Sequence, residues 1–215
     1  MSDLRERLGA ARLYLVCEDL DEAFLDAALR GGVDIVQLRM KTSDDDAIVR
    51  TGHRFRRVTD RHGALLIIND RPDLVAEIGA DGAHLGQDDM PIAQARPIVG
   101  GDRLLGLSTH SPAQIESAAD AEVDYIGVGP VQATPTKPGR PAVGLELVRY
   151  AAQHAATPFF AIGGISAANV GAVRHAGALR IAVVRALTQA SDPEATARAL
   201  RQGVVAAQEA RVGAT

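Results

Sequence analysis

Residues 129–144 read GPVQATPTKPGRPAVG, and they pose the main question about how this chain folds. This segment holds four of the ten prolines of the chain and directly follows a strongly apolar run. Proline-rich composition is typical of a linker between two domains. Two threonines, a lysine and an arginine are equally typical of a loop that binds an anion. The number of β–α units on either side of the segment separates the two interpretations.

Short β-rich apolar segments alternate with longer amphipathic segments along the whole chain. We expect eight strands, at residues 12–16, 34–39, 64–70, 81–87, 103–108, 124–129, 159–164 and 179–184. The sequences SPAQ and SDPE predict helix starts capped by Ser111 and Ser191. Eight such units in about 200 residues are typical of a closed (β/α)8 TIM barrel. An open doubly wound sheet is the alternative, but no glycine-rich fingerprint follows the first strand.

The segment at residues 129–144 is therefore predicted to be a long loop within one α/β domain. Only two β–α units follow it, and two units cannot close a barrel or cover both faces of a sheet. We predict a single domain over residues 1–215, with an N-terminal extension at 1–11 and a frayed tail at 209–215. Long loops are usually functional, and in a barrel this loop lies at the C-terminal face, where active sites are built.

Composition excludes several classes of protein. Apolar residues make up 47% and aromatic residues 3%, so we expect an aliphatic core of the kind found in buried parallel sheets. A net charge of −4 without a basic block disfavours nucleic-acid binding. A single cysteine, Cys17, excludes a disulfide framework, and no apolar run reaches the about 18–20 residues of a membrane span. The charged N-terminus predicts no signal peptide. We therefore expect a cytoplasmic protein, and the sequence leaves open whether it forms a homo-oligomer.

Cations and an amide follow the second predicted strand. It ends in QLRMK, and strand alternation places Gln37, Arg39 and Lys41 on one side of the backbone. These groups suit an anionic ligand. The alternative is a solvated strand end that pairs with the nearby SDDD at residues 43–46.

Two carboxylates follow the third and fourth predicted strands. Asn69 and Asp70 end the third strand, while His84 lies in the fourth and Asp89 follows it. Because consecutive strands are neighbours in a barrel, Asp70 and Asp89 are expected to approach each other. A pair of carboxylates with open positions suits Mg²⁺, which takes substrate phosphates as further ligands. Each aspartate could instead cap a helix ahead of the next proline, and the two roles are compatible.

Groups that suit phosphate follow the later strands. Ser108 ends the fifth strand, and Thr134, Thr136 and Lys137 follow the sixth. Two hydroxyls and an ammonium within four residues suit a phosphate, although a solvated loop is the alternative. A glycine pair ending in Gly164 follows the seventh strand and would let the backbone N–H groups approach a phosphate, or simply form a tight turn.

The strand ends therefore predict two anion sites. One combines a metal with lysine and arginine and suits a diphosphate, whereas the other is neutral, built of backbone, and suits a monophosphate. The chain shows neither a Ser–His–Asp set nor a lysine within an apolar strand. This absence favours positioning and leaving-group stabilisation over covalent catalysis.

A resemblance to a known family adds to these inferences. From residue 12 to 193 the chain carries, in order, QLRMK, IND, DGAHLGQDD, GLS, DYIGVGPVQATPTK, VGLE, FFAIGGI and AVVRA. This series resembles the thiamine phosphate synthase family. The HLGQ-acidic-Asp and GPV…T-x-T-K motifs are specific, while IGGI is shared with many phosphate-binding barrels. The resemblance implies a transferase that couples hydroxymethylpyrimidine diphosphate to thiazole phosphate, or its carboxylated form, through Mg²⁺-assisted loss of diphosphate.

The resemblance also implies roles for individual residues. Those expected to bind the pyrimidine diphosphate are Gln37, Arg39, Lys41, Asn69, Ser108 and Lys137, with His84 as a further substrate-binding residue. Arg39, Lys41, Ser108 and Lys137 are the expected catalytic residues, and Asp70 and Asp89 the expected Mg²⁺ ligands. The thiazole phosphate would be held by Thr134, Thr136, Gly164 and the turn formed by Val184 and Arg185. The family often has serine where this chain has Arg185, so no side-chain role is transferred to that position.

Two alternatives from other functional classes were weighed against coupling. One is a thiazole tautomerase-like barrel, which isomerises the thiazole phosphate, and the other is a non-catalytic barrel that binds thiamine precursors. Neither needs a diphosphate site. The pair Asp70 and Asp89, together with the T-x-T-K segment, therefore argues against both.

Overall fold

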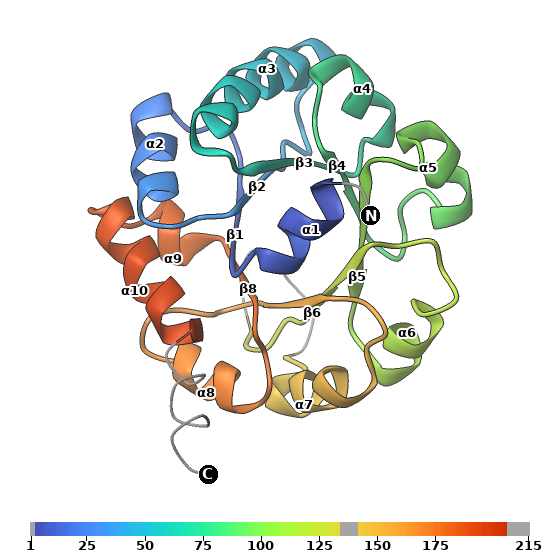
Figure 1. The fold of residues 1–215 in the computed structure, drawn as a ribbon, viewed down its shortest axis with the longest axis vertical. Coiled ribbons are helices and arrows are strands. Elements are labelled where there is room, and N and C mark those ends of the chain that lie inside the picture. Colours follow the sequence, from blue (N-terminus) through green and yellow to red (C-terminus); the bar gives the residue numbers. More distant parts are fainter. Residues whose placement is uncertain (1–2, 134–141, 206–215) are drawn as a thin grey trace.

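The structure, a computed structural model, describes residues 3–133 and 142–205 and contains a closed barrel of parallel strands (Figure 1). In chain order the strands are β1 Leu13–Cys17, β2 Ile35–Leu38, β3 Leu65–Asn69, β4 Gly82–Leu85, β5 Leu104–Thr109, β6 Tyr125–Val128, β7 Phe159–Ile162 and β8 Ile181–Val183. Each strand pairs with its neighbours in sequence, and β1 pairs with β8 to close the ring. The predicted single-domain (β/α)8 barrel is confirmed. The outer limits predicted for the domain, residues 1 and 215, lie outside the described residues and stay a prediction.

Helices surround the strands on the outside of the ring (Figure 1). They are α2 Glu22–Arg30, α3 Asp45–His62, η1 Pro72–Leu74, α4 Val75–Ile78, α5 Ile92–Val99, α6 Pro112–Ser117, α7 Gly144–His154, α8 Val170–His175, α9 Arg185–Thr188 and α10 Pro193–Val205. Within the described ranges, none of them has both the length and the apolar character needed to cross a bilayer.

Helix starts follow the predicted capping chemistry with one correction. The Ser111 side chain accepts a hydrogen bond from the backbone N–H of Gln114 and caps α6 as predicted. The start of α10 differs, because the Asp192 side chain accepts the N–H of Ala195 at 2.9 Å. Proline is the first residue of α10, so the position directly before it, Asp192 rather than Ser191, is the capping position.

The core is largely aliphatic, as composition predicts, but the barrel interior also holds an aromatic cluster. Tyr14 from β1, Tyr125 from β6 and Phe160 from β7 meet inside the ring, and both tyrosines pack edge-to-face on the phenylalanine at 5.3 and 5.7 Å between ring centroids. Gly106 on β5 makes room for them, since a Cβ there would lie 2.2 Å from Tyr125 Cζ. These three aromatic residues form a floor across the barrel.

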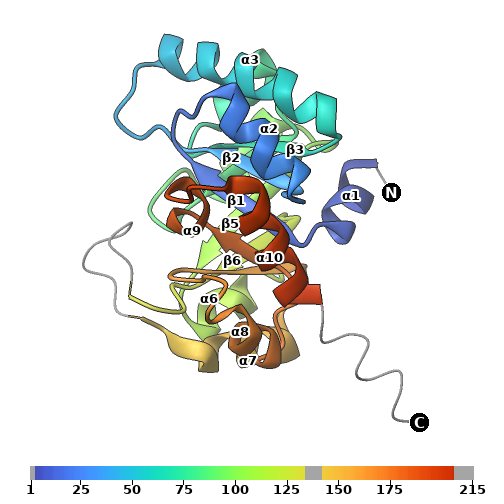
Figure 2. The ribbon, with the colours of Figure 1, turned by 90° about the vertical axis from the view of Figure 1, so that its left-hand side faces the viewer.

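An additional helix, α1 Asp3–Ala10, lies across one end of the barrel (Figures 1 and 2). Its residue Leu8 is buried in the same interior cluster as Leu65 and Leu104, which begin β3 and β5. This is therefore the N-terminal end of the strands. The segment predicted as an N-terminal extension contains a helix that covers the bottom of the barrel.

Three aspartates at this same end tie the strands to the helices, and we call them the strand clamps. Asp34, Asp81 and Asp124 directly precede β2, β4 and β6. Each carboxylate accepts a backbone N–H from the preceding strand, from Leu13 at 3.0 Å, Leu66 at 2.7 Å and Leu105 at 2.8 Å respectively. Each also forms an ion pair with an arginine of a surrounding helix: Arg201 with Asp34, Arg56 with Asp81, and Arg96 with Asp124. The strand clamps neutralise the buried charge where the strands begin.

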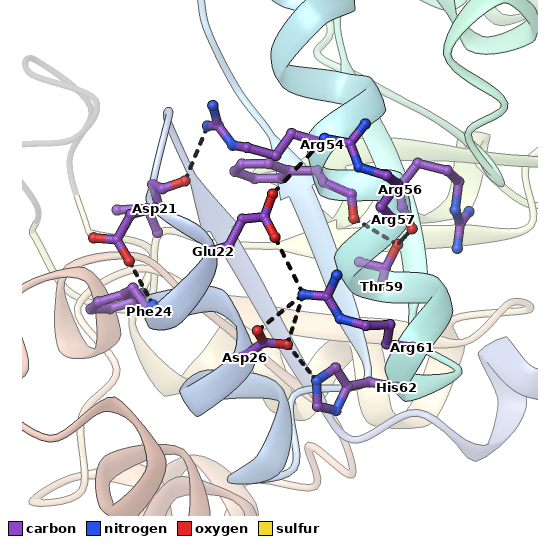
Figure 3. A network of polar contacts seen from close by, with 12 residues as sticks. Asp21, Glu22, Phe24, Asp26, Arg54, Arg56, Arg57, Thr59, Arg61 and His62 are labelled. Carbon is purple, nitrogen blue, oxygen red and sulfur yellow. Dashed lines mark hydrogen bonds and ion pairs between the residues drawn. The ribbon is translucent and has the colours of Figure 1, made fainter.

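The first two surrounding helices are joined by a network of ion pairs at their surface (Figure 3). Asp26 on α2 contacts Arg61 at 3.0 Å and His62 at 2.8 Å, both at the end of α3. Glu22 contacts the same Arg61 at 3.4 Å. The His62 and Arg61 contacts lower the pKa of Asp26. Because these groups are partly solvated, each pair adds little stability.

The strand clamps predict that removing a buried carboxylate lowers the free energy of unfolding more than removing an exposed one. Asp124→Ala is expected to lower the free energy of unfolding by about 3–5 kcal/mol, because it leaves Arg96, whose side chain is 12% exposed, without its carboxylate. Glu146→Ala is the control, since that carboxylate is 86% exposed in its pair with Arg149, and it should cost less than about 1 kcal/mol. Urea unfolding followed by circular dichroism measures both. Equal losses in the two variants would contradict the clamp.

Candidate active site

A cavity of about 340 Å³ opens at the carboxyl ends of the strands, above the aromatic floor. Eight of the predicted site residues line it: Gln37, Arg39, Asn69, His84, Ser108, Gly164, Val184 and Arg185. The lining residues in the described part of the chain include two arginines but no aspartate or glutamate. The cavity is therefore positively charged, although the whole chain carries a net charge of −4. Such a lining favours an anionic ligand.

A chain of hydrogen bonds runs across the cavity floor, and we call it the polar chain. Gln37 Nε2 donates to Tyr14 Oη at 2.7 Å, and the Tyr14 and Tyr125 hydroxyls lie 3.0 Å apart. His84 continues it, with Nδ1 3.3 Å from Tyr125 Oη and Nε2 2.9 Å from Ser108 Oγ. The polar chain holds Gln37, His84 and Ser108 in fixed orientations around the cavity.

The two tyrosines of the polar chain stay protonated. Burial raises the pKa of both Tyr14 and Tyr125, so both hydroxyls keep their protons at neutral pH. Tyr14 accepts from Gln37, and either tyrosine can donate across the contact between them. The roles of the two His84 nitrogens toward Tyr125 and Ser108 depend on the tautomer of the ring.

Next to the cavity, Lys41, Asp70 and Asp89 form a second cluster. Lys41 Nζ lies 2.6 Å from Asp70 Oδ2, and the carboxyl group of Asp70 neighbours that of Asp89. Asp89 Oδ2 also accepts the backbone N–H of Gly86 at 2.7 Å. Burial raises the pKa of Asp89, and the neighbouring Asp70 raises it further, while the Gly86 N–H and Lys41 act in the opposite direction. We call Asp70 and Asp89 the carboxylate pair.

The alternatives weighed for these residues are not borne out. Neither η1 nor α5 has a side-chain cap, so Asp70 and Asp89 do not cap the helices that follow them. Lys41 pairs with Asp70 and not with SDDD, whose Asp44 instead caps α3 by accepting the N–H of Ala47. Lys41 is not among the residues that line the cavity, because β2 ends at Leu38 and the strand alternation ends with it.

The carboxylate pair is the place in this structure where a metal ion could be held. Within residues 3–133 and 142–205, no group of three or more His, Cys, Asp or Glu side chains could hold a metal. A site made only of protein ligands is therefore not present in that part of the chain. Two neighbouring carboxyl groups fit a hydrated cation, which would relieve their mutual repulsion and take other ligands from water or substrate.

The glycines after β7 are required by both conformation and packing. Gly163 and Gly164 have φ values of 105° and 65°, which favour glycine. A Cβ on Gly163 would lie 2.5 Å from Pro130, and one on Gly164 would lie 2.8 Å from Gln132 Cβ. Asn169 Nδ2 holds the turn by donating to the Gly164 carbonyl at 2.8 Å. The turn brings the Gly164 backbone to the cavity wall.

The described ends of the loop at residues 129–144 lie against this turn. The N–H groups of Val131 and Gln132 donate to the carbonyls of Ile162 and Gly163 at 2.9 and 3.1 Å, and Val143 N–H returns to the Pro130 carbonyl at 2.8 Å. The segment therefore leaves and re-enters the same barrel, as a loop of one domain does. The predicted ligands Thr134, Thr136 and Lys137 lie outside the described residues.

The tyrosines of the polar chain were not predicted from the strand ends. Tyr14 and Tyr125 line the cavity, but Tyr14 lies within β1 and Tyr125 begins β6, so neither is at the carboxyl end of its strand. A signal was present, because these are two of only three tyrosines in a chain with 3% aromatic residues. A hydroxyl in an otherwise aliphatic strand needs a hydrogen-bond partner inside the barrel.

Known proteins give an independent view of this site. Residues 13–187 match the family described as thiamine monophosphate synthase. Thiamine-phosphate synthases of Thermobifida fusca and Acidothermus cellulolyticus are 53% and 51% identical, covering 96% and 88% of this chain and 98% and 93% of their own lengths. The longer thiamine-phosphate synthase of Gloeobacter violaceus is 53% identical over 90% of this chain, which spans 58% of that relative.

Solved structures agree with the sequence relatives. The thiamine phosphate pyrophosphorylase of Pyrococcus furiosus superposes with a TM-score of 0.84 at 31% identity, over 94% of this chain and 98% of that one. A 3-hexulose-6-phosphate synthase of Salmonella typhimurium reaches 0.68 at 16% identity, covering 91% and 99% of the two chains, and shares the fold alone. The similarity in sequence and structure extends over nearly the whole barrel, and the chain belongs to the thiamine monophosphate synthase family of transferases.

Proposed function

We propose that the chain couples 4-amino-5-hydroxymethyl-2-methylpyrimidine diphosphate with 4-methyl-5-(2-phosphoethyl)thiazole to give thiamine phosphate and diphosphate. With the carboxylated form of the thiazole, carbon dioxide is released as well. The observation that carries the proposal is the cavity lining, which contains Arg39 and Arg185 but no acid in the described residues. A cationic cavity beside a carboxylate pair suits two phosphorylated substrates and a metal. The relatives named above are synthases and give no support to a tautomerase or a non-catalytic binder.

The chemistry proposed for the site is loss of diphosphate followed by capture of the pyrimidine. The bond between the pyrimidine methylene carbon and oxygen breaks, and its electron pair leaves with the diphosphate. The thiazole nitrogen then supplies the electron pair of the new carbon–nitrogen bond. Arg39, which lines the cavity, and Lys41 beside it are proposed to neutralise the charge that develops on the leaving group, and Lys137 is expected to add a third cation. No covalent bond to the protein is needed.

Three polar side chains of the cavity suit the pyrimidine ring. Gln37, Asn69 and Ser108 all line the cavity, and they offer both donors and acceptors to an aminopyrimidine. The polar chain supports this assignment, because it holds the Gln37 and Ser108 side chains in place at the cavity. A ring held on the aromatic floor would have its methylene group facing the mouth of the cavity, where Arg39 lies.

Magnesium is proposed as the cofactor, with the carboxylate pair as its protein ligands. Burial and the neighbouring Asp70 raise the pKa of Asp89, and this supports the assignment, since a bound cation would stabilise the charged carboxylate. When bound, the ion would supply positive charge to the oxygens of the departing diphosphate. Without a third protein ligand in the described residues, diphosphate and water would complete its shell.

The thiazole phosphate is proposed to bind at Gly164 and the turn formed by Val184 and Arg185, which line the far side of the cavity. Thr134 and Thr136 remain predicted ligands. We also propose that the protein is cytoplasmic, in keeping with its lone, buried cysteine.

The direct test is to incubate the protein with both substrates and Mg²⁺ and to measure thiamine phosphate and diphosphate. Equal amounts of the two products are expected, and neither should form when one substrate is left out. Incubation with the thiazole phosphate alone should leave that compound unchanged. Isomerisation of the thiazole without coupling would instead support a tautomerase.

The carboxylate pair gives the first prediction about residues. Asp89→Asn is expected to lower Mg²⁺-dependent turnover by about 10²–10³, because it removes a charge that holds an electrostatic stabiliser of the leaving group. Product formation over a range of Mg²⁺ concentrations measures the loss. Asp88→Asn is the matched control, as it removes the neighbouring exposed acid, and it should keep activity near wild type. Unchanged turnover in Asp89→Asn would show that the metal assignment is wrong.

The same variant is expected to stabilise the metal-free protein at neutral pH. The folded state raises the pKa of Asp89, so its contribution to stability is present below the unfolded pKa of about 3.9 and is lost as pH rises through the raised pKa. Asparagine stays neutral and avoids this loss. Thermal unfolding in a chelating buffer should therefore give Asp89→Asn a higher Tm than wild type at pH 7. The difference should vanish below about pH 3.9. A lower Tm at pH 7 would contradict the raised pKa.

A further inference from the structure

His110 directly follows β5 and lines the cavity, and no role was predicted for it from the sequence. Its backbone is fixed at the start of α6, because the Gln114 side chain accepts the His110 N–H at 2.7 Å. Its ring is hydrogen-bonded through Nδ1 to the carbonyl oxygen of Gly129, which directly follows β6. Because a carbonyl oxygen can only accept, Nδ1 carries a hydrogen and donates it. The His110 side chain therefore joins the rim of β5 to that of β6.

Gly129 begins a short segment, residues 129–133, that we call the loop base. On the side away from His110 it lies against β7. A Cβ on Gly129 would lie 2.0 Å from the carbonyl oxygen of Ile162, so the two backbones are in close contact. Val131 N–H donates to that same carbonyl at 2.9 Å. The loop base is thus held by the backbone of β7 on one side and by the His110 side chain on the other.

The loop base forms the cavity wall between the positions proposed for the two substrates. Its residues Gly129, Pro130 and Ala133 line the cavity and offer only backbone and aliphatic groups. Ser108, proposed for the pyrimidine, belongs to β5, and Gly164, proposed for the thiazole phosphate, follows β7. Because β6 lies between β5 and β7 in the ring, the loop base that follows β6 lies between these two positions. A wall of this kind keeps water from the reacting atoms as long as it stays in place.

We propose that His110 is a positioning residue that holds the loop base against the cavity, so that the pyrimidine is captured by the thiazole nitrogen and not by water. This inference rests on the proposed function. Once the bond to diphosphate has broken, the methylene carbon can accept an electron pair from the thiazole nitrogen or from a water oxygen. Capture by water releases a proton and gives the pyrimidine alcohol and diphosphate, but no thiamine phosphate. His110 therefore affects how the reaction divides between two products.

The test uses two substitutions that place an amide nitrogen at different positions of the former ring. In asparagine this nitrogen takes the place of Nδ1, whereas in glutamine it takes the place of Nε2. With both substrates and Mg²⁺ at saturation, His110→Gln is expected to lower the rate of thiamine phosphate formation about 3- to 10-fold, the effect of losing one hydrogen bond. Diphosphate should then exceed thiamine phosphate, and the difference should be found as the pyrimidine alcohol. His110→Asn keeps the donor and should form both products in equal amounts.

A matched control removes the same kind of hydrogen bond elsewhere. His175 Nδ1, on α8, lies 2.6 Å from the carbonyl oxygen of Gly171, and this histidine lies outside the described cavity lining. His175→Gln should leave the two products in equal amounts. A second measurement needs no substrate: amide hydrogen exchange of the peptide that contains residues 129–133, followed by mass spectrometry, should be faster in His110→Gln than in wild type or His110→Asn.

The outcomes separate the inference from the proposed function. Equal amounts of the two products in His110→Gln would overturn the inference while coupling stands. The same excess of diphosphate in His110→Asn would also overturn it, because the effect would then not depend on the donor at Nδ1. Failure of the wild-type protein to form thiamine phosphate would overturn the proposed function. Hydrogen exchange would still decide whether His110 holds the loop base, and an unchanged rate in His110→Gln would show that it does not.

Discussion

The hydrogen bonds between β1 and β8 are the constraint on which the rest of the structure depends. They pair Leu13 with Ile181 and Leu15 with Val183, and they bring the first and last strands side by side. Because the strands run in parallel around the ring, all their carboxyl ends meet at one rim. As a result, Gln37 of β2 and Arg185, which directly follows β8, line a single cavity.

Charged side chains are paired at one end of the barrel and partly unpaired, within the described residues, at the other. At the N-terminal end the strand clamps pair every carboxylate they contain with an arginine and a backbone N–H, as Asp124 with Arg96 and Leu105 illustrates. At the carboxyl end, Arg39 and Arg185 have no side-chain partner among the described residues. The two carboxyl groups of the carboxylate pair lie close together there, and the pKa of Asp89 is raised. Sites that bind ligands leave such groups unsatisfied, whereas groups that only stabilise the fold are satisfied within it.

Sequence patterns predicted most of the fold and much of the site, for identifiable reasons. Alternation is reliable inside a strand, so Gln37 was placed correctly, but β2 ends before Lys41, whose side chain turns to Asp70. The approach of Asp70 to Asp89 was predictable because neighbouring strands end at neighbouring positions. The polar chain was not predictable, because it joins Tyr14 of β1 to Tyr125 of β6 across the barrel. These strands are far apart in the sequence, and no local sequence pattern indicates a contact between them.

Helix α1 has a consequence for how ligands move. With Leu8 buried beneath the strands and the aromatic floor above it, the barrel is blind-ended, and the cavity opens toward the carboxyl rim. A molecule that lies on the floor against Tyr125 must pass the rim before another molecule covers it. It must also leave after that second molecule, unless the two leave as one. Joining the two ligands would let the molecule on the floor leave together with the one that covers it, while the diphosphate leaves separately.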